Sequence, residues 1–541
     1  MGNALSYNIQ EHTLSLGKQG KLKGLQYDDK ARRYAAVPYA LPPIGQHRWH
    51  KPRPLPSSFS YTGSDGKPFD ATAFLPPCAQ EDRELSTGNV ADDAVMGTED
   101  CLYVNIWTPV PRDEDTSTKK WPVMVWLHGG WFQVGNACQE PAMDPTELIS
   151  TGKLNAIVVA ISYRLNIFGF LTSKAFLEEN SGTGAVNFGL WDQRLALEWI
   201  YSNIGMFGGD VSNITLAGRS AGAYGVEAQI LHDFRRQANP LAGKLFHKAW
   251  MSSNAIPAQP KTVHEAESQF DEVCEHFKIP ATLSASEKLS ALRQISQADL
   301  LKCLRLLKNH TFRPVTDDLF FHSGMIDYIE DGTFAKEFQA RNMKLLIGEV
   351  ANEETLYAQF NGPTEGKFES LLLQTANYYS PKTTEMVLHQ YTVPNTSDLK
   401  DWKDLFGRII ADGQVRASSR FLIDSLSRNG VSTRYIWRYR VNYRLSFIDE
   451  SVAPMDYGVS HAMDGPLWNF SINQLPSDEE RVMMTEWIQI LVAFVNGEEG
   501  FDFGTRNIDD VKVLTDQKTI VVEKDARYDE LRNLGEVFSK S

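Results

Sequence analysis

The chain has 541 residues, of which 42% are hydrophobic and 23% charged, and its formal net charge is −14. This composition is typical of a globular protein that buries a large core, and we attribute the negative charge to solubility. The acidic balance argues against nucleic acid and against anionic membranes as partners, because both bind through lysine and arginine.

Targeting signals are sparse. The longest apolar run, residues 487–495, is shorter than the roughly 18 residues of a membrane-spanning helix and ends at Asn496-Gly497, so it predicts a buried helix and no transmembrane segment. The first residues contain no apolar segment typical of a signal peptide, which favours a cytoplasmic protein, with a secreted protein that has lost its leader as the alternative. Residues 1–6 fit the N-myristoylation pattern at Gly2, but no basic cluster follows to strengthen a lipid anchor.

The first predicted elements are strands separated by turns. A polar, Gly- and Ser-rich stretch over residues 56–100 predicts a long surface loop. Continuous apolar runs at 121–127 and 156–162 predict strands that are buried on both faces. Residues 190–207 then follow with the apolar spacing of a helix. The alternation of strands and helices indicates an α/β fold.

The second half of the chain contains two long helical regions. Residues 262–344 and 365–427 have apolar residues at helical spacing and are predicted as insertions around a central sheet. No repeat, low-complexity tract or linker divides the chain. We therefore expect one domain over residues 1–541.

A candidate nucleophile lies between these regions. Residues 214–225 read as a short apolar strand, a Gly-x-Ser-x-Gly turn centred on Ser220, and a helix. Gly218 and Gly222 permit the tight turn, which holds the serine oxygen clear of the backbone at a helix N-terminus that favours negative charge. The pentapeptide alone also fits an ordinary strand–turn–helix, so the assignment depends on partners elsewhere in the chain.

A serine nucleophile requires a histidine base, which comes last in the chain order of α/β-hydrolases. His389 lies in a helical pattern, and a helix interior rarely carries a side chain to a distant serine. His461 lies in the Gly-flanked stretch 457–465, which predicts a loop. His461 is therefore the predicted base.

The acid that orients the base is expected after a strand between Ser220 and His461. Residues 344–348 predict such a strand. Glu349, Glu353 and Glu354 follow it, and the physical chemistry of the sequence does not choose among these three carboxylates.

Donors for the oxyanion are expected from the residue after the nucleophile, Ala221, and from a glycine-rich loop after an early strand. Gly129 and Gly130, followed by Trp131, directly follow the strand predicted at 121–127. Glycine lets backbone N–H groups approach a ligand closely. A simple strand-to-helix turn is the alternative for each feature alone, but the two together favour an oxyanion site.

At this point the sequence resembles the type-B carboxylesterase/lipase family of α/β-hydrolases, which includes cholinesterases and fungal lipases. The resemblance extends over nearly the whole chain and includes fungal carboxylesterases. It implies a large, mostly parallel central sheet with helices on both faces. The motifs that carry it are Val37-Pro-Tyr-Ala40, Glu99-Asp-Cys-Leu-Tyr-Val-Asn105, His128-Gly-Gly130, Ser162-Tyr-Arg-Leu-Asn166, Asn187-Phe-Gly-Leu190, Phe207-Gly-Gly-Asp210, Gly218-Arg-Ser-Ala-Gly-Ala223 and Gly458-Val-Ser-His461.

The resemblance also implies roles for single residues. The family's acid lies five residues after the strand-end glycine, which makes Glu353 the acid. Ser253 and Asp464 stand where the family has buried polar supports for the catalytic residues.

The five cysteines leave at least one free thiol. The family's first disulfide matches Cys78 and Cys101. Cys274 and Cys303 would form a second disulfide, which leaves Cys138 as the free thiol.

Three departures from the family pattern concern the substrate. Trp131 replaces the third glycine of the oxyanion loop, and Arg219 replaces the glutamate before the nucleophile. No tryptophan lies between Cys78 and Cys101, where cholinesterases have their choline-binding indole, so we do not expect a quaternary ammonium substrate.

The sequence thus predicts a serine carboxylic-ester hydrolase that acts on a small or medium apolar ester. Arg219 and Phe132 are the candidate pocket residues. No metal or organic cofactor is required, and a monomer or a dimer is equally compatible with the sequence. The alternatives are an acyltransferase, lactonising or lactone-opening enzyme of small-molecule biosynthesis with the same residues, and a non-catalytic binding or adhesion protein with the same fold.

Overall fold

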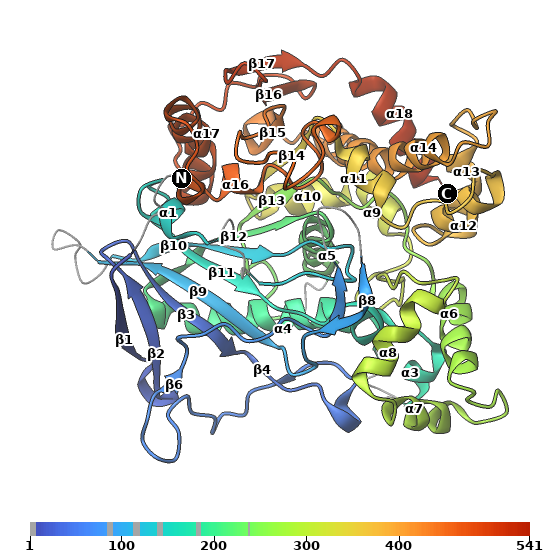
Figure 1. The fold of residues 1–541 in the computed structure, drawn as a ribbon. Helices are drawn as coiled ribbons and strands as arrows, with labels where there is room; N and C mark the ends of the chain where they lie inside the picture. The colour runs from blue at the N-terminus through green and yellow to red at the C-terminus, as the bar shows by residue number, and fades with distance from the viewer. Residues whose placement is uncertain are drawn as a thin grey trace.

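The computed structural model describes residues 7–83, 90–111, 119–137, 144–179, 185–235 and 239–540. A large twisted sheet runs through the molecule, and helices lie on both of its faces (Figure 1). The strands of this sheet are β1 (Ile9–Ser15), β2 (Lys21–Tyr27), β3 (Ala31–Pro38), β6 (Phe69–Asp70), β9 (Tyr103–Pro109), β10 (Trp121–Leu127), β11 (Ile157–Ile161), β12 (Gly209–Arg219), β13 (Lys248–Ser252), β14 (Lys344–Val350), β15 (Ile436–Val441), β16 (Asp510–Leu514) and β17 (Ile520–Lys524).

The sheet is parallel at its centre and antiparallel at its edges. Its main path runs β1-β2-β3-β9-β11-β10-β12-β13-β14-β15-β16-β17, and the strands from β11 to β16 pair in parallel. The antiparallel pairs join β1 to β2, β2 to β3, β3 to β9, β9 to β11, and β16 to β17. The carboxyl ends of the central parallel strands therefore meet at one edge, which is where α/β proteins place their sites.

Helices occupy the connections between these strands. Their bounds are α1 (Thr146–Ile149), α2 (Asn166–Phe170), α3 (Lys174–Glu179), α4 (Phe188–Asn203), α5 (Ala221–Arg235), α6 (Val263–His276), α7 (Ala285–Arg293), α8 (Gln297–Cys303), α9 (Met325–Glu330), α10 (Thr333–Ala340), α11 (Glu353–Gln359), α12 (Phe368–Ala376), α13 (Pro381–Leu388), α14 (Leu399–Ala411), α15 (Ser418–Arg428), α16 (Gly465–Trp468), α17 (Asp478–Asn496) and α18 (Tyr528–Ser539).

Side chains alternate along β10 between two cores. Val125 and Leu127 belong to a hydrophobic cluster with residues of α4 and α5 on one face of the sheet. Met124 and Trp126 belong to a second cluster with residues of α17 on the other face. Figure 1 shows α4 and α17 on opposite sides of the strands. Burial on both faces explains why 121–127 reads as a continuous apolar run.

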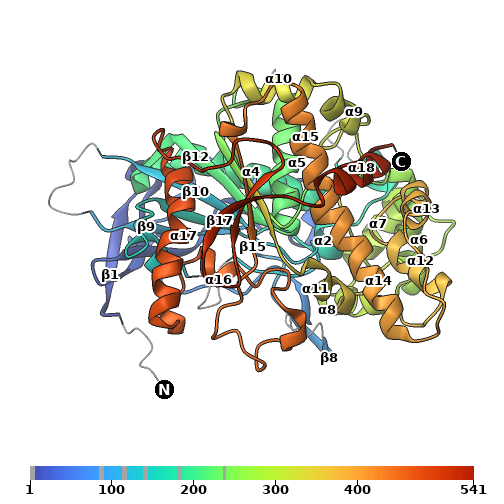
Figure 2. The ribbon, with the colours of Figure 1, turned by 90° about the horizontal axis from the view of Figure 1, so that it is seen from above.

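The regions predicted as helical insertions contain α6 to α10 and α12 to α15. Residues of α9, α10 and α15 join the hydrophobic cluster that covers one face of the sheet. Helices α6, α12 and α13 lie together at one side of the molecule, as the view from above shows (Figure 2). A third hydrophobic cluster lies under α11 to α14 and α18, and Trp131 belongs to it. The insertions therefore form a wall beside the carboxyl ends of the central strands.

Several sequence expectations need correction or lie outside the described residues. Residues 56–100 are not one long loop: they contain β6 and an antiparallel pair of β7 (Gln80–Arg83) and β8 (Val90–Met96), and another short pair joins β4 (Ala40–Leu41) to β5 (Arg53–Pro54). The Cys274–Cys303 disulfide is not formed, and both residues are buried free thiols. Cys138 and Gly2 lie outside the described residues.

None of the helices in the described part of the chain combines the length and the apolar character that crossing a bilayer demands.

The disulfide between Cys78 and Cys101 is formed, with a sequence separation of 23 residues. Beside it, the Gln80 side chain makes two hydrogen bonds to Gly135: its Nε2 donates to the Gly135 carbonyl, and its Oε1 accepts from the Gly135 N–H, each at 2.8 Å. Gly135 belongs to the loop that follows β10. The disulfide-closed segment therefore holds that loop in place.

Replacing Cys78 and Cys101 by serine should destabilise the protein. The disulfide limits the conformational entropy of the unfolded chain, so we expect the free energy of unfolding to fall by about 3 kcal/mol. Urea unfolding with and without dithiothreitol measures this difference. The reductant should lower the midpoint of the wild-type protein and leave the double variant unchanged, and equal sensitivity of both proteins would contradict the prediction.

Candidate active site

Ser220 lies at the turn between β12 and α5 and has a left-handed backbone with a φ of 56°. A non-glycine residue in this region carries strain that the surrounding structure must hold in place. The Ser220 N–H donates to the Ser252 carbonyl at the end of β13 (2.8 Å), and the Ser220 carbonyl accepts from the Tyr224 N–H in α5 (3.0 Å). The turn is thus fixed to the neighbouring strand on one side and to its own helix on the other.

Two glycines allow β10 and the turn to approach closely. In the pairing of β10 with β12, Leu127 is opposite Gly218, so the residues that follow each strand lie side by side. A Cβ on Gly222 would lie 2.0 Å from the Leu127 carbonyl oxygen, and one on Gly129 would lie 2.8 Å from the Arg219 carbonyl oxygen. Any larger residue at either position would push the loop after β10 away from Ser220.

His461 lies in the loop between β15 and α16, and Glu353 begins α11 directly after β14. The His461 Nδ1 and the Glu353 Oε2 are 2.5 Å apart, and both side chains are buried. The other oxygen of Glu353 accepts from the Val350 N–H at 2.9 Å. The Nε2 of His461 has no hydrogen-bond partner among the described residues. One ring nitrogen is thus held by a carboxylate, and the other is left to act on a ligand.

The structure gives each of the three candidate carboxylates a different partner. Glu349 forms a bidentate ion pair with Arg420, and Glu354 pairs with Arg416. Although burial opposes it, the charge of Arg420 lowers the pKa of the Glu349 carboxyl. Only Glu353 contacts a histidine.

The loop that carries His461 is tied to the loop that carries Glu353. The Asn352 N–H donates to the Val459 carbonyl, and the Asn352 Oδ1 accepts from the Val459 N–H, each at 3.0 Å. The Thr355 hydroxyl donates to the Ser460 Oγ at 2.8 Å. Asn352 is a positioning residue that the sequence analysis missed, although its place directly before the candidate acid was a signal for it.

The loop after β10 approaches Ser220 closely: a Cβ on Gly129 would lie 3.0 Å from the Ser220 Cβ. Gly130 and Trp131 have positive φ angles of 109° and 58°, and the Gly130 carbonyl accepts two hydrogen bonds from within the loop. Within the described residues, the N–H groups of Gly129, Gly130, Trp131 and Ala221 donate no hydrogen bond. Donors without internal partners beside a nucleophile are the feature of an oxyanion site.

These groups surround one cavity of about 450 Å³. Ser220, His461, Gly129, Gly130 and Trp131 line it together, which brings the predicted nucleophile and base to one place with three of the four predicted donors, whereas Ala221 and Glu353 do not line it. Much of the remaining wall is apolar and comes from Trp126, Trp131, Leu356, Phe447, Ile448 and Met463. His389, the other candidate base, is an exposed residue at the end of α13.

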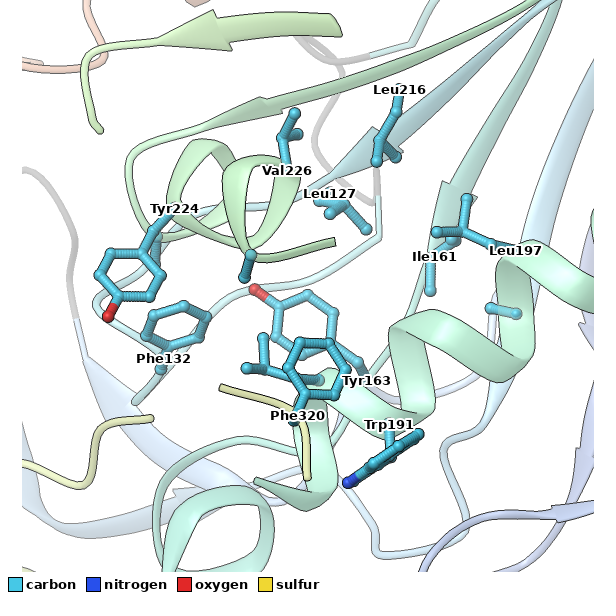
Figure 3. Packing of buried hydrophobic residues seen from close by; sticks show 14 of the residues in the cluster. Leu127, Phe132, Ile161, Tyr163, Trp191, Leu197, Leu216, Tyr224, Val226 and Phe320 are labelled. Atoms are coloured by element: carbon cyan, nitrogen blue, oxygen red, sulfur yellow. The ribbon is translucent and has the colours of Figure 1, made fainter. Parts of the chain in front are cut away.

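Phe132 is not a pocket residue. It is fully buried in the core, where its ring contacts Tyr224 edge-on with 5.5 Å between the ring centroids. Figure 3 shows Phe132 beside Tyr224 among the packed residues below the turn. The backbone of Phe132 has a φ of 65°, and this turn directs its side chain into the core, a reversal that the sequence pattern did not predict.

Tyr357 is a second residue that the sequence analysis missed. Its ring lies between Trp131 and His461, with centroid distances of 6.3 and 5.0 Å. Burial and then the charge of Glu353 raise the pKa of the Tyr357 phenol well above its usual value, so the hydroxyl stays protonated. Its spacing of four residues from Glu353, one turn along α11, places it on the same face as the acid.

The two residues expected to support the catalytic group are both buried. Ser253 has a left-handed φ of 54°, and its N–H donates to the Gly348 carbonyl at 2.8 Å. Asp464 accepts from the Trp468 indole N–H at 2.9 Å. Burial raises the pKa of the Asp464 carboxyl, and the charge of Arg219 opposes this shift.

A buried carboxyl behind the nucleophile makes stability depend on pH. Glu227 lies two turns after Ser220 in α5 and accepts from the Ile256 N–H at 2.7 Å. Burial raises the pKa of the Glu227 carboxyl to about 8, and the Ile256 N–H only partly opposes this. The folded protein therefore holds this proton over a pH range in which the unfolded chain has released it.

Glu227→Gln should remove that pH dependence. Because the folded pKa is raised, the contribution of Glu227 is complete below the unfolded pKa of about 4.5 and is lost as the pH rises through about 8. We expect wild-type stability to fall relative to the variant between pH 5 and 8, by at most about 1.4 kcal/mol per pH unit. Chemical unfolding at several pH values measures this, and a constant difference between the two proteins would contradict it.

Comparison with known proteins agrees with this geometry. The carboxylesterase family matches residues 11–525. The chain is 37% identical to an uncharacterized esterase/lipase of Schizosaccharomyces pombe, over 96% of this chain and 95% of that protein. It is 34% identical to a carboxylic ester hydrolase of Gibberella moniliformis, over 97% and 96% of the two chains. The solved structure of a PNB esterase superimposes with a TM-score of 0.70 at 26% identity and covers 97% of this chain and 100% of its own. The chain therefore belongs to the carboxylesterase family, has the α/β-hydrolase fold and is a carboxylic ester hydrolase.

Proposed function

We propose that Ser220, His461 and Glu353 act as a catalytic triad on a small or medium apolar ester. His461 takes the proton of the Ser220 hydroxyl as the oxygen attacks the ester carbonyl, and it then gives that proton to the departing alcohol. Glu353 fixes the tautomer of His461 by accepting from its Nδ1. Water then attacks the acyl-enzyme, again with His461 as the base, and releases the acid.

The observation that carries this proposal is the placement of His461. One of its ring nitrogens meets Glu353 at 2.5 Å, and the other has no partner among the described residues. The ring lines the same cavity as Ser220. A base must be oriented by a third group and must reach the nucleophile, and this placement supports both requirements.

The oxyanion loop supports the same chemistry. The N–H groups of Gly129, Gly130, Trp131 and Ala221 are directed by backbone geometry rather than by flexible side chains. They would stabilise the negative charge that forms on the carbonyl oxygen, and one such donor is typically worth about 2.7–4 kcal/mol in the transition state.

The shape and lining of the cavity support a substrate of modest size with an apolar body. Its volume of about 450 Å³ lies within the usual range for small-molecule sites. Trp131 forms part of its wall, and stacking of the indole on Phe360, with 4.3 Å between the ring centroids, holds it there. An acyl-enzyme resolved by an alcohol or amine remains the second candidate, and product analysis with competing nucleophiles separates it from hydrolysis.

Ser220→Ala should abolish turnover of p-nitrophenyl esters. The variant lacks the attacking oxygen, so we expect a fall in kcat on the order of 10⁶-fold, as for loss of the nucleophile in other serine hydrolases. Ser202→Ala serves as the matched control, because Ser202 is exposed on α4 and donates to the Glu198 carbonyl of its own helix. Activity retained in the Ser220 variant would refute the proposed mechanism.

The three carboxylates after β14 allow a test of the acid. Glu353→Gln should lower kcat by about 10³- to 10⁴-fold, because the His461 tautomer is no longer fixed. Glu354→Gln, which weakens only a pair with Arg416, should change kcat less than tenfold. Steady-state kinetics of the two adjacent variants decides the matter, and a larger loss in the Glu354 variant would overturn the assignment.

A further inference from the structure

Arg219 places a positive charge in the wall of the active-site cavity. It is the residue directly before Ser220, and its side chain is half-buried and lines the cavity beside the nucleophile. Its guanidinium carbon lies 5.7 Å from the centre of the Trp126 ring, so the indole supports the cation from one side.

The charge of Arg219 has no ion-pair partner within the described part of the chain. Its Nη1 donates to the Ala462 carbonyl at 3.2 Å, whereas its Nε is buried and has no acceptor among the described residues. Asp464 is near enough for the charge of Arg219 to oppose the rise that burial causes in the pKa of its carboxyl. Its Oδ2 accepts from the Trp468 indole, whereas its Oδ1 is buried and makes no hydrogen bond among the described residues, and no ion pair joins Asp464 to Arg219 there. A half-buried guanidinium with such incomplete pairing favours an anion from outside the chain.

Apart from Arg219, the described residues of the cavity wall include no acidic side chain that could pair with Arg219 and no other lysine or arginine that could bind the anion. The wall opposite Ser220 is largely apolar. In such surroundings a charge is screened less than in water, so one cation has a large effect on the choice of substrate.

The position of Arg219 beside the His461 loop places it near the alcohol portion of a bound ester. The guanidinium packs against the backbone that follows His461: it bonds to Ala462, and a Cβ on Gly465 would lie 2.8 Å from Nη2. His461 must protonate the departing oxygen, so the alcohol portion of the substrate lies beside the His461 loop. Trp131, by contrast, packs against Tyr357 and Phe360 on α11.

We propose that the cavity accepts an ester whose alcohol portion carries a carboxylate, and that the Arg219 guanidinium binds this carboxylate. The proposal rests on the proposed function, because it uses the same nucleophile and base. It makes the preferred substrate an apolar ester with one anionic group and disfavours a cationic alcohol.

The test compares isosteric substrates that differ by one charge. On the alcohol side the pair is 4-acetoxybenzoate and 4-acetoxybenzamide. On the acyl side the pair is the mono-4-nitrophenyl ester of adipate and the analogue in which the free carboxylate is replaced by a carboxamide. The ratio of kcat/KM for the anionic and the neutral member is measured for the wild-type protein, Arg219→Gln and Arg219→Lys. Arg506→Gln is the matched control, because it removes the same charge from a side chain that is 65% exposed and paired with Asp502.

For the alcohol-side pair, Arg219→Gln should lower this ratio by roughly 10- to 100-fold, the usual effect of losing a charge-assisted hydrogen bond. Arg219→Lys should retain part of the preference, and Arg506→Gln should retain all of it. An equal loss for both members of the pair would mean that Arg219 is only structural, and it would overturn the proposal. A change confined to the adipate pair would overturn the assignment to the alcohol side.

A binding measurement separates this proposal from the proposed function. Calorimetry with the Ser220→Ala protein, in which turnover is removed, should show that 4-acetoxybenzoate binds about tenfold or more tightly than 4-acetoxybenzamide. Adding Arg219→Gln to that protein should remove the difference. Equal binding of the two compounds would contradict the role of Arg219 even if Ser220 is the nucleophile, and a clear preference would support it even if the enzyme transfers the acyl group elsewhere.

Discussion

The left-handed backbone of Ser220 is the constraint on which the site depends. It is held because β10, β12 and β13 end at the same edge of the sheet, where the Ser252 carbonyl accepts from the Ser220 N–H. Gly222 brings the turn into contact with the end of β10. The same approach that fixes Ser220 therefore fixes its distance from the loop after β10, the proposed oxyanion loop. The large sheet supplies the rigidity that a strained turn requires.

The charged side chains near this turn differ in whether they have an ion-pair partner. Glu354 pairs with Arg416, between α14 and α15, and Glu349 pairs with Arg420 in α15, so neither carboxylate is left to compete for His461. Glu353 lies between them in sequence and alone faces the imidazole. Arg219, on the other side of Ser220, has no such partner among the described residues.

Much of the fold and part of the site could be predicted from sequence, for identifiable reasons. Strand β10 reads as a continuous apolar run because it is buried on both faces. The loop pattern around His461, against the helical pattern around His389, selected His461 as the candidate base. The acid could not be chosen from local sequence, because the arginines that pair with the other two glutamates are distant in the chain. Arg416 lies 62 residues after Glu354, and Arg420 lies 71 residues after Glu349. The predicted pocket role of Phe132 was wrong because a single backbone turn with a positive φ decides where its side chain lies. The predicted Cys274–Cys303 disulfide was also wrong, since both residues are buried free thiols.

The most direct test of the central claim is to identify the residue that reacts with a fluorophosphonate. The reagent should phosphonylate the native protein once, and peptide mapping by mass spectrometry should place the adduct on Ser220. Prior unfolding should abolish the reaction, because an isolated serine hydroxyl is a weak nucleophile. An adduct on another residue, or no adduct on the native protein, would contradict the account.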